Sequence, residues 1–320
     1  MKVNTINANE IKIINPVNNR EIVCAFHDID GTHSLIRNWP PVMSRVLYDT
    51  AVNGIPENLE SEENINRLVS LCDTEVLEET DKFCIESAGL SALTQMEWAI
   101  RRNQELTNGK YNSEINSEII KRIWAGEEKF ESYNEPKEYL DYLNEKTPKL
   151  FWVYEQVLNR FCRDKNLKEA KENPEKFLIK GSMEFMNYLH SNGIKNYFVT
   201  GAVVDKSIEP PMGMYEEVLG LGFEIGEGLP VEDILGSTWD EKIPKDEVMR
   251  RLVKELGIKG ENVLVIGDGR SEISAGVALG AVTISILPEN ATRQRELHTE
   301  LGTNMIVSDY TDKDLLQIIK

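Results

Sequence analysis

The sequence predicts an α/β protein in which a mostly parallel sheet is interrupted by a large all-helical insertion. Three observations lead to this fold class. Short runs of β-branched and aromatic residues, bounded by turn formers, recur near residue 22 and through the C-terminal half, as in buried strands. Amphipathic helical patterns that stop at a glycine separate most of these runs. Between about residues 39 and 180 the strand-like runs vanish and helical patterns follow one another.

Five runs are predicted to form one sheet, because strand–helix–strand alternation with short links gives right-handed crossovers and parallel strands. These strands are expected at residues 22–26, 197–199, 263–266, 283–287 and 305–307. Helices are expected at 182–191, 246–256 and 272–279, followed by Gly193, Gly257 and Gly280. Residues 3–14 and the Asn18-Asn19 turn predict an extra N-terminal strand or hairpin.

The insertion is expected to contain helices at residues 42–52, 61–71, 90–102, 116–130, 137–143 and 151–163. Turn-forming residues break this series at 53–56, 108–109 and 173–174. We therefore predict a discontinuous core made of residues 1–36 and 178–320, and a helical domain at 37–177.

The composition excludes several classes of protein. The 320 residues include 36 Lys and Arg against 54 Asp and Glu, a net charge of -18, which opposes binding to a phosphate backbone. The four cysteines form no C-x-x-C pair, so neither a zinc ribbon nor a disulfide framework is expected. Neither a signal-peptide pattern nor an apolar run of about 18 residues occurs. We expect a cytoplasmic monomer or homodimer without a nucleic-acid or membrane partner.

A pair of acids follows the first predicted core strand, in Phe26-His27-Asp28-Ile29-Asp30-Gly31-Thr32. In an extended segment these two carboxylates project to the same side, about 6 to 7 Å apart. Because close carboxylates repel, either one is protonated or a cation keeps both ionised. An ionised Asp28 can attack phosphorus, and a protonated Asp30 can give its proton to a leaving alkoxide. A solvated turn is the alternative interpretation of this motif taken alone.

Two later stretches could bind an anion. Thr200 and Gly201 follow a predicted strand, where a hydroxyl and free backbone N–H groups form a neutral cradle. Lys242 and Lys245 precede a helix, where a positive charge has the wrong sign for the helix dipole and a bound phosphoryl group would explain it. A solvated lysine is the alternative at either position.

The last stretch is Ile266-Gly267-Asp268-Gly269-Arg270-Ser271-Glu272, after a strand that is predicted to be buried. The two glycines allow a tight turn that exposes the Asp268 carboxylate, and Glu272 faces the same way one helical turn later. Mg2+ prefers such oxygen ligands, completed by water and phosphate. All four stretches lie at strand ends or helix starts, where open α/β sheets bind ligands.

In type and order, these four stretches resemble the four signature motifs of the haloacid dehalogenase-like (HAD) hydrolase superfamily. They are the acid pair, the Thr-Gly, the lysine before a helix, and the Gly-Asp-Gly with a trailing acid. The resemblance covers residues 22–32 and 181–320 and implies a Rossmann-like core. The helical insertion after the first motif is similar to the family's helical (C1-type) cap, which closes over the pocket and selects the substrate.

The resemblance also implies roles for individual residues. Asp28 would be the nucleophile, and Asp30 the general acid and then the general base. Thr200 and the Gly201 backbone would bind phosphoryl oxygens. Lys245 resembles the motif lysine better than Lys242 does, because its distance to the helix end at 256–257 suits the family, and the choice stays open. Asp28, the main-chain carbonyl of Asp30 and Asp268 would hold Mg2+, with Glu272 in support.

Family members that cleave carbon–halogen or carbon–phosphorus bonds resemble this pattern but lack an aspartate at the position of Asp30. We therefore expect a Mg2+-dependent phosphatase that acts on a small phosphorylated metabolite through an aspartyl-phosphate. A phosphomutase is an alternative that the sequence does not separate from it. A non-catalytic binding or scaffold protein is a third, disfavoured because it has no need to keep three acids together. Substrate selection is expected from residues of the insertion and of the segment before it, namely His33, Arg37, Trp39, Glu97, Arg101 and Arg102, although solvated side chains are favoured for the last two.

Overall fold

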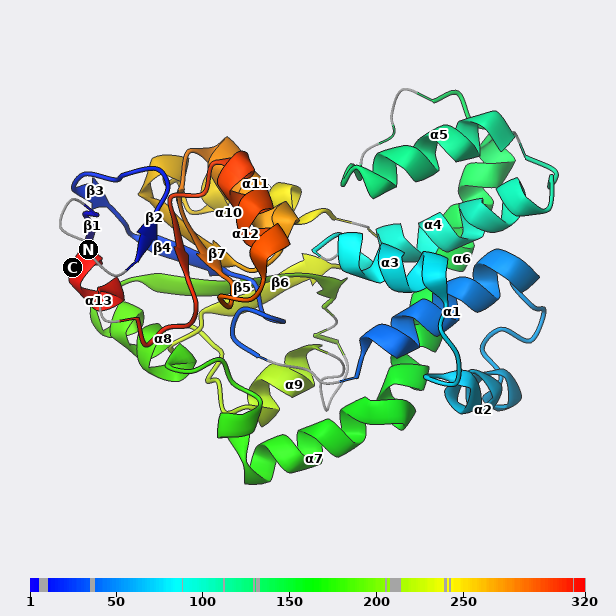
Figure 1. The fold of residues 1–320 in the computed structure, drawn as a ribbon, viewed down its shortest axis with the longest axis horizontal. Coiled ribbons are helices and arrows are strands. Elements are labelled where there is room, and N and C mark those ends of the chain that lie inside the picture. Colours follow the sequence, from blue (N-terminus) through cyan, green and yellow to red (C-terminus); the bar gives the residue numbers. More distant parts are fainter. Residues whose placement is uncertain are drawn as a thin grey trace. The chain divides into compact units, whose positions relative to one another are not determined.

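The computed structural model describes residues 1–5, 11–34, 38–87, 89–111, 113–128, 130, 133–204, 206–207, 214–238, 241, 243–312 and 314–319 (Figure 1). The chain divides into two compact units. The core unit consists of Met1–Ile36, Leu167–Ser237 and Ile243–Lys320. The helical unit consists of Arg37–Asn166 and Thr238–Lys242.

Over the described ranges, the core unit is built on a seven-stranded sheet with the order β2-β9-β8-β7-β4-β5-β6. Its strands are parallel except for β2, which pairs with β9 antiparallel. The predicted α/β fold class is therefore confirmed. The strands are β2 (Lys12–Ile13), β4 (Cys24–His27), β5 (Lys195–Val203), β6 (Asp233–Ser237), β7 (Val263–Gly267), β8 (Val282–Ile286) and β9 (Met305–Val307), and β1 (Lys2–Val3) pairs separately with β3 (Arg20–Glu21).

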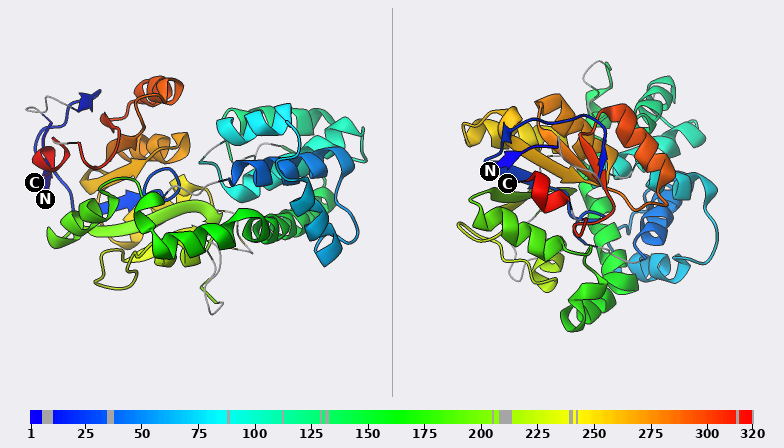
Figure 2. Two further views of the ribbon diagram at one scale, coloured as in Figure 1. Left: turned by 60° about the horizontal axis from the view of Figure 1, so that its bottom comes forward. Right: turned by 60° about the vertical axis from the view of Figure 1, so that its left-hand side comes forward.

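Helices cover both faces of the sheet, as Figures 1 and 2 show. Side chains alternate between the faces along each strand. Ala25 and Leu264 pack in the same apolar cluster as α8, whereas Phe26 and Val265 pack with α10. The helices of this unit are α8 (Ser182–Ser191), α9 (Met214–Gly220), α10 (Lys245–Glu255), α11 (Arg270–Leu279), α12 (Thr292–Leu301) and α13 (Leu315–Ile318), with short 3-10 turns at Pro174–Lys176 and Gly260–Asn262.

The helical unit packs around α4, which contacts α1, α5 and α6. Trp98 of α4 stacks on Phe83 with 4.1 Å between ring centroids, and Trp124 meets Trp98 edge-on. The helices are α1 (Pro40–Asn53), α2 (Glu62–Leu71), α3 (Glu78–Glu86), α4 (Ala92–Leu106), α5 (Ser113–Trp124), α6 (Lys137–Leu158), the π-helical turn Asn159–Arg163, and α7 (Asp164–Glu172), which continues into the core unit.

Two of the predicted helices form one helix in the structure. The helices expected at 137–143 and 151–163 join in α6, which runs through Pro148. Proline removes one helical hydrogen bond, but Leu143, Leu150 and Val157 are buried at helical spacing on either side of it. Burial of this apolar stripe offsets the lost bond.

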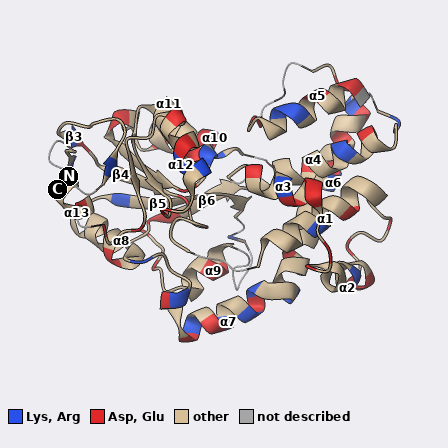
Figure 3. Cartoon of the chain, in the orientation of Figure 1, with Lys and Arg blue, Asp and Glu red and all other residues tan. Residues whose placement is uncertain are grey.

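The surface helices mix charges of both signs, as Figure 3 shows on α7 and α10. On α10, Arg250 pairs with Asp246 and Arg251 pairs with Glu247, four residues apart. Such exposed pairs contribute about 0.5 kcal/mol each. Among the described helices, none combines the length and the apolar character that crossing a membrane requires.

Candidate active site

The first motif forms a tight turn directly after β4. The Asp28 amide still donates to the carbonyl of Ile266 in β7, at 2.9 Å, and the amides of residues 32 to 34 then donate to the carbonyl of Ile29. Gly31 has φ +78°, and a Cβ there would lie 2.1 Å from Oδ2 of Asp268. Only glycine lets this turn approach the carboxylate of the fourth motif so closely.

The carboxylates of Asp28, Asp268 and Glu272 gather at this end of the sheet, with oxygens within 4.8 Å of one another. β4 and β7 are neighbouring parallel strands, so the segments that follow them meet at one edge. Lys245, at the start of α10, donates to Oδ1 of Asp28 at 2.6 Å and to Oε2 of Glu272 at 3.0 Å. Two of the three carboxylates thus share one ammonium group, and Asp268 has no contact with it.

The cluster shifts the pKa values of its members in different directions. Burial raises the pKa of Asp28 to about 7, although Lys245 opposes this shift. Burial and the charges of Asp28 and Glu272 raise the pKa of Asp268 well above its usual value. Burial acts the same way on Glu272, but Lys245 and the Gly269 amide outweigh it and lower that pKa. The surrounding protein therefore stabilises the charge of Glu272, and it compensates the charges of Asp28 and Asp268 least.

The donor set fits a hard divalent cation such as Mg2+, because it consists of carboxylate oxygens with too little positive charge nearby. Glu272 is already engaged: the Gly269 amide donates to Oε1, while Lys245 and Ser271 donate to Oε2. It is thus placed to hold the loop and the lysine, with Asp28 and Asp268 left for a metal. The role predicted for the Asp30 carbonyl stays a prediction.

The predicted phosphate cradle lies inside a strand and not after it. β5 continues to Val203, with an irregularity in its pairing to β6 between Val199 and Val203. Thr200 is buried, and its hydroxyl accepts a hydrogen bond from the Ala202 amide at 3.1 Å. Phe198 pairs with His27, the residue before Asp28. Thr200 and Gly201 follow Phe198 in β5 and therefore still reach the sheet edge that carries Asp28. Two other candidates, Arg37 and Lys242, lie outside the described residues.

A family model for haloacid dehalogenase-like hydrolases matches residues 28–280. The chain belongs to this family. A predicted phosphatase from Clostridium acetobutylicum is similar in structure, with 15% identity, a TM-score of 0.51 and coverage of 93% of this chain and 99% of that one. A phosphonoacetaldehyde hydrolase-like protein from Oleispira antarctica is 12% identical, with a TM-score of 0.50 and coverage of 98% and 95%. Both show a shared fold. None of the curated proteins matches this sequence.

Two histidines of this HAD-like hydrolase form a buried hydrogen-bond chain beneath the first motif. His27 Nε2 lies 3.2 Å from Oδ1 of Asn196, whose amide nitrogen donates to a main-chain carbonyl, so we assign the His27 proton to Nε2. His27 Nδ1 then accepts from His33 Nε2 at 2.9 Å, and His33 Nδ1 accepts from Ser182 at 2.7 Å. His33 is fully buried, so the expectation that it contacts substrate is wrong.

Arg101 is likewise structural, although the sequence favoured a solvated side chain. It is buried, ion-pairs with Glu97 and Glu135, and lies over the ring of Tyr139. Arg102 pairs with Glu79 and Glu105. The positions of Arg101 and Arg102 on α4 did not indicate these partners, because most of them belong to other segments of the chain.

Two further buried groups near Asp30, Ser34 and Glu217, were not predicted from the sequence of this HAD-like hydrolase. Ser34 Oγ lies 3.1 Å from Oδ1 of Asp30 and 3.3 Å from Oε1 of Glu217. Ser34 follows the first motif closely, but Glu217 belongs to α9, far along the chain. Only the folded structure brings them together.

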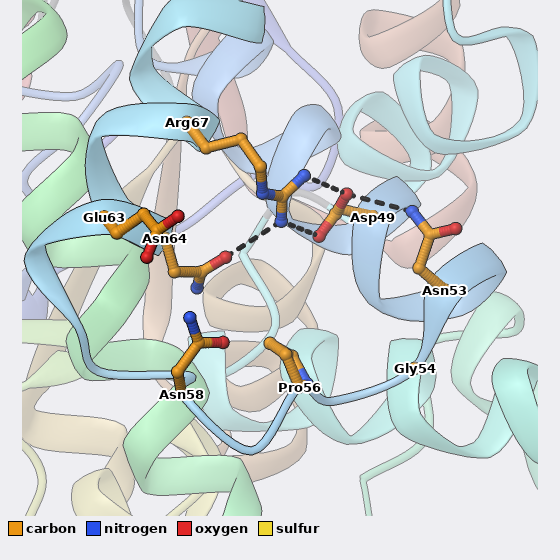
Figure 4. Close-up of a pocket in the computed structure, with 8 residues that line it drawn as sticks. All are labelled: Asp49, Asn53, Gly54, Pro56, Asn58, Glu63, Asn64 and Arg67. Carbon is orange, nitrogen blue, oxygen red and sulfur yellow. Dashed lines mark hydrogen bonds and ion pairs between the residues drawn. The ribbon is translucent and has the colours of Figure 1, made fainter.

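The helical unit has a polar cavity of about 290 Å³ between α1 and α2, shown in Figure 4. Arg67 donates to both carboxylate oxygens of Asp49, at 2.9 and 2.6 Å, and to the Asn64 side chain. Asn53 also donates to Asp49. These groups satisfy one another, so the cluster ties α1 to α2.

Proposed function

We propose that this HAD-like hydrolase is a Mg2+-dependent phosphatase that acts on a small phosphorylated metabolite through an aspartyl-phosphate. One observation carries the proposal: Asp28, Asp268 and Glu272 converge beside Lys245, in a chain whose family membership predicts those groups. Phosphoryl transfer needs this kind of site, because positioning and charge neutralisation do most of the work.

The metal would be held by Asp28, Asp268 and the Asp30 carbonyl, with Glu272 in support. When bound, it neutralises phosphoryl charge and aligns that group with the nucleophile. Lys245, buried against Asp28, keeps the nucleophile oriented and adds a positive charge beside it.

The reaction then has two steps. An oxygen of Asp28 forms a bond to phosphorus while the ester P–O bond breaks, and Asp30 gives its proton to the leaving oxygen. Asp30, now a carboxylate, takes a proton from water as the water oxygen attacks phosphorus and the Asp28–phosphorus bond breaks. Thr200, the Gly201 backbone and Lys245 hold phosphoryl oxygens throughout, and Arg37 contributes to substrate binding.

The test is a screen of phosphorylated metabolites with Mg2+, repeated with chelator and with Asp28→Asn. We expect release of inorganic phosphate that both controls abolish. Turnover that survives Asp28→Asn would reject the nucleophile. If the phosphoryl group returns to the substrate at another position, the enzyme is a phosphomutase, and if no compound reacts, a binding role replaces the catalytic one.

A further inference from the structure

The hydroxyl of Ser34 lies between two carboxyl groups of the core unit. Its oxygen is 3.1 Å from Oδ1 of Asp30 and 3.3 Å from Oε1 of Glu217. The Ser34 amide donates to the carbonyl of Ile29, and its carbonyl accepts from the Gly31 amide. The hydroxyl is therefore carried by the same tight turn that carries Asp30.

Glu217 is anchored to that turn from another part of the fold. Its neighbour on α9, Val218, packs in one apolar cluster with Ile29. Only 4% of Glu217 and 1% of Ser34 are exposed. Desolvation of a buried carboxyl or hydroxyl group is unfavourable unless the group forms a hydrogen bond. The contact between Ser34 and Glu217 offsets this cost for both groups.

We propose that Ser34 and Glu217 are positioning residues for Asp30, an inference that rests on the acid–base role of Asp30 in the proposed function. Ser34 donates its single hydroxyl hydrogen to Oδ1 of Asp30, so Oδ2 is the oxygen that carries a proton to the leaving group. Glu217 fixes the hydroxyl from its other side. Glu217 Oε1, at 3.3 Å, is the other acceptor within reach of that hydroxyl, so the group at position 217 controls whether the Ser34 hydrogen is directed at Asp30.

This arrangement predicts that variants without the Ser34 hydroxyl are impaired only in the transfer of a proton from Asp30 to the leaving oxygen. Without Ser34, the Asp30 carboxyl can rotate away from the leaving oxygen, and the reaction slows only where that oxygen needs a proton to depart. Phenolate needs it more than p-nitrophenolate, which is a weaker base. Phosphate binding and attack by Asp28 are unaffected.

The experiment measures single-turnover release of phenol from phenyl phosphate and of p-nitrophenol from p-nitrophenyl phosphate, with Mg2+. General acid catalysis contributes about 10²- to 10⁴-fold, so imperfect positioning in Ser34→Ala and Glu217→Met is expected to slow phenol release by about 10- to 100-fold. Release of p-nitrophenol should change less than about 3-fold on the same reasoning. Glu217→Gln should keep phenol release near the wild-type rate, because its amide donates to Ser34 and leaves the Ser34 hydrogen for Asp30. Glu216→Met, the matched control on α9, leaves both rates unchanged.

Three results would overturn the inference. Equal losses with both substrates in Ser34→Ala indicate damage to the fold or to phosphate binding, and unchanged rates remove any role for Ser34. Equal effects of Glu217→Gln and Glu217→Met remove Glu217 from the hydrogen-bond chain. Asp30→Asn separates this failure from that of the proposed function: if it releases both products at the wild-type rate, the acid–base role itself is wrong.

Discussion

Replacing Asp268 by asparagine should stabilise the metal-free protein while it removes the response to Mg2+. Asp268 shares the cluster with Asp28 and Glu272, but Lys245 contacts only the other two. At a pH high enough to ionise both groups, two carboxylates within 4.8 Å of each other repel by about 3 kcal/mol at an effective dielectric constant of about 20. Because Asp268 is partly exposed, solvent screening reduces the expected gain to about 1 to 2 kcal/mol.

The geometry around Asp268 survives the substitution. Asparagine has the same shape, fits against Gly31 and can still accept the hydrogen bond that Thr32 donates at 3.0 Å. A cation that binds only the folded state adds RT ln(1 + [L]/Kd), about 2.7 kcal/mol at a hundredfold excess over Kd. The wild type should gain this stabilisation from Mg2+, and the variant should gain little.

Urea unfolding of both proteins, in chelator and in excess Mg2+, measures these free energies. The expected signature is a reversal: Asp268→Asn is the more stable protein in chelator, and the wild type is the more stable one in Mg2+. Asp141→Asn, an exposed position on α6, should change the free energy of unfolding by less than about 0.5 kcal/mol. If Asp268→Asn is less stable than the wild type in chelator, the charge argument for a metal site fails.

Two further substitutions test the fold around and beyond the site. Gly31→Ala places a Cβ 2.1 Å from the Asp268 carboxylate and should reduce turnover at least about 100-fold. Gly193→Ala is the control, because Gly193 also has a positive φ of +77° but has open space around it. This variant should lose only about 1 kcal/mol in the free energy of unfolding by urea, and its turnover should be unchanged. Arg101→Met leaves Glu135 buried without its partner and should destabilise the protein by about 3 to 5 kcal/mol in urea. Adding Glu135→Gln should recover part of that loss, and no recovery would mean that packing, rather than charge, explains it.

The core strands could be predicted because a parallel sheet that is covered on both faces needs near-continuous apolar runs. β4, β7 and β9 are such runs, and their side chains are fully buried. β6, at the sheet edge, was not predicted: Asp233, Gly236 and Ser237 leave it only two apolar residues, and it is partly exposed. α6 was predicted as two helices because a local pattern around Pro148 carries no information about the buried stripe that holds the helix together.

In the candidate site, too, some residues could be predicted from the sequence and some contacts could not. Asp28 and Asp268 could be singled out, because each follows an apolar run that predicts a strand. The order of strands in the sheet could not be deduced from the sequence, although the adjacency of β4 and β7 is what brings the two carboxylates together. The Ser34–Glu217 contact depends on the placement of α9, which no local pattern encodes.

The two glycines around Asp268 have a structural role that their sequence pattern alone did not indicate. Their sequence pattern predicted a tight turn that exposes a carboxylate. A Cβ on Gly267 would lie 2.2 Å from Cγ of Glu272, and one on Gly269 would lie 2.7 Å from its Oε1. Both positions therefore make room for Glu272, which accepts hydrogen bonds from Lys245 and from the Gly269 amide. The motif builds an anchor for the lysine, and this anchor keeps the ammonium group beside Asp28.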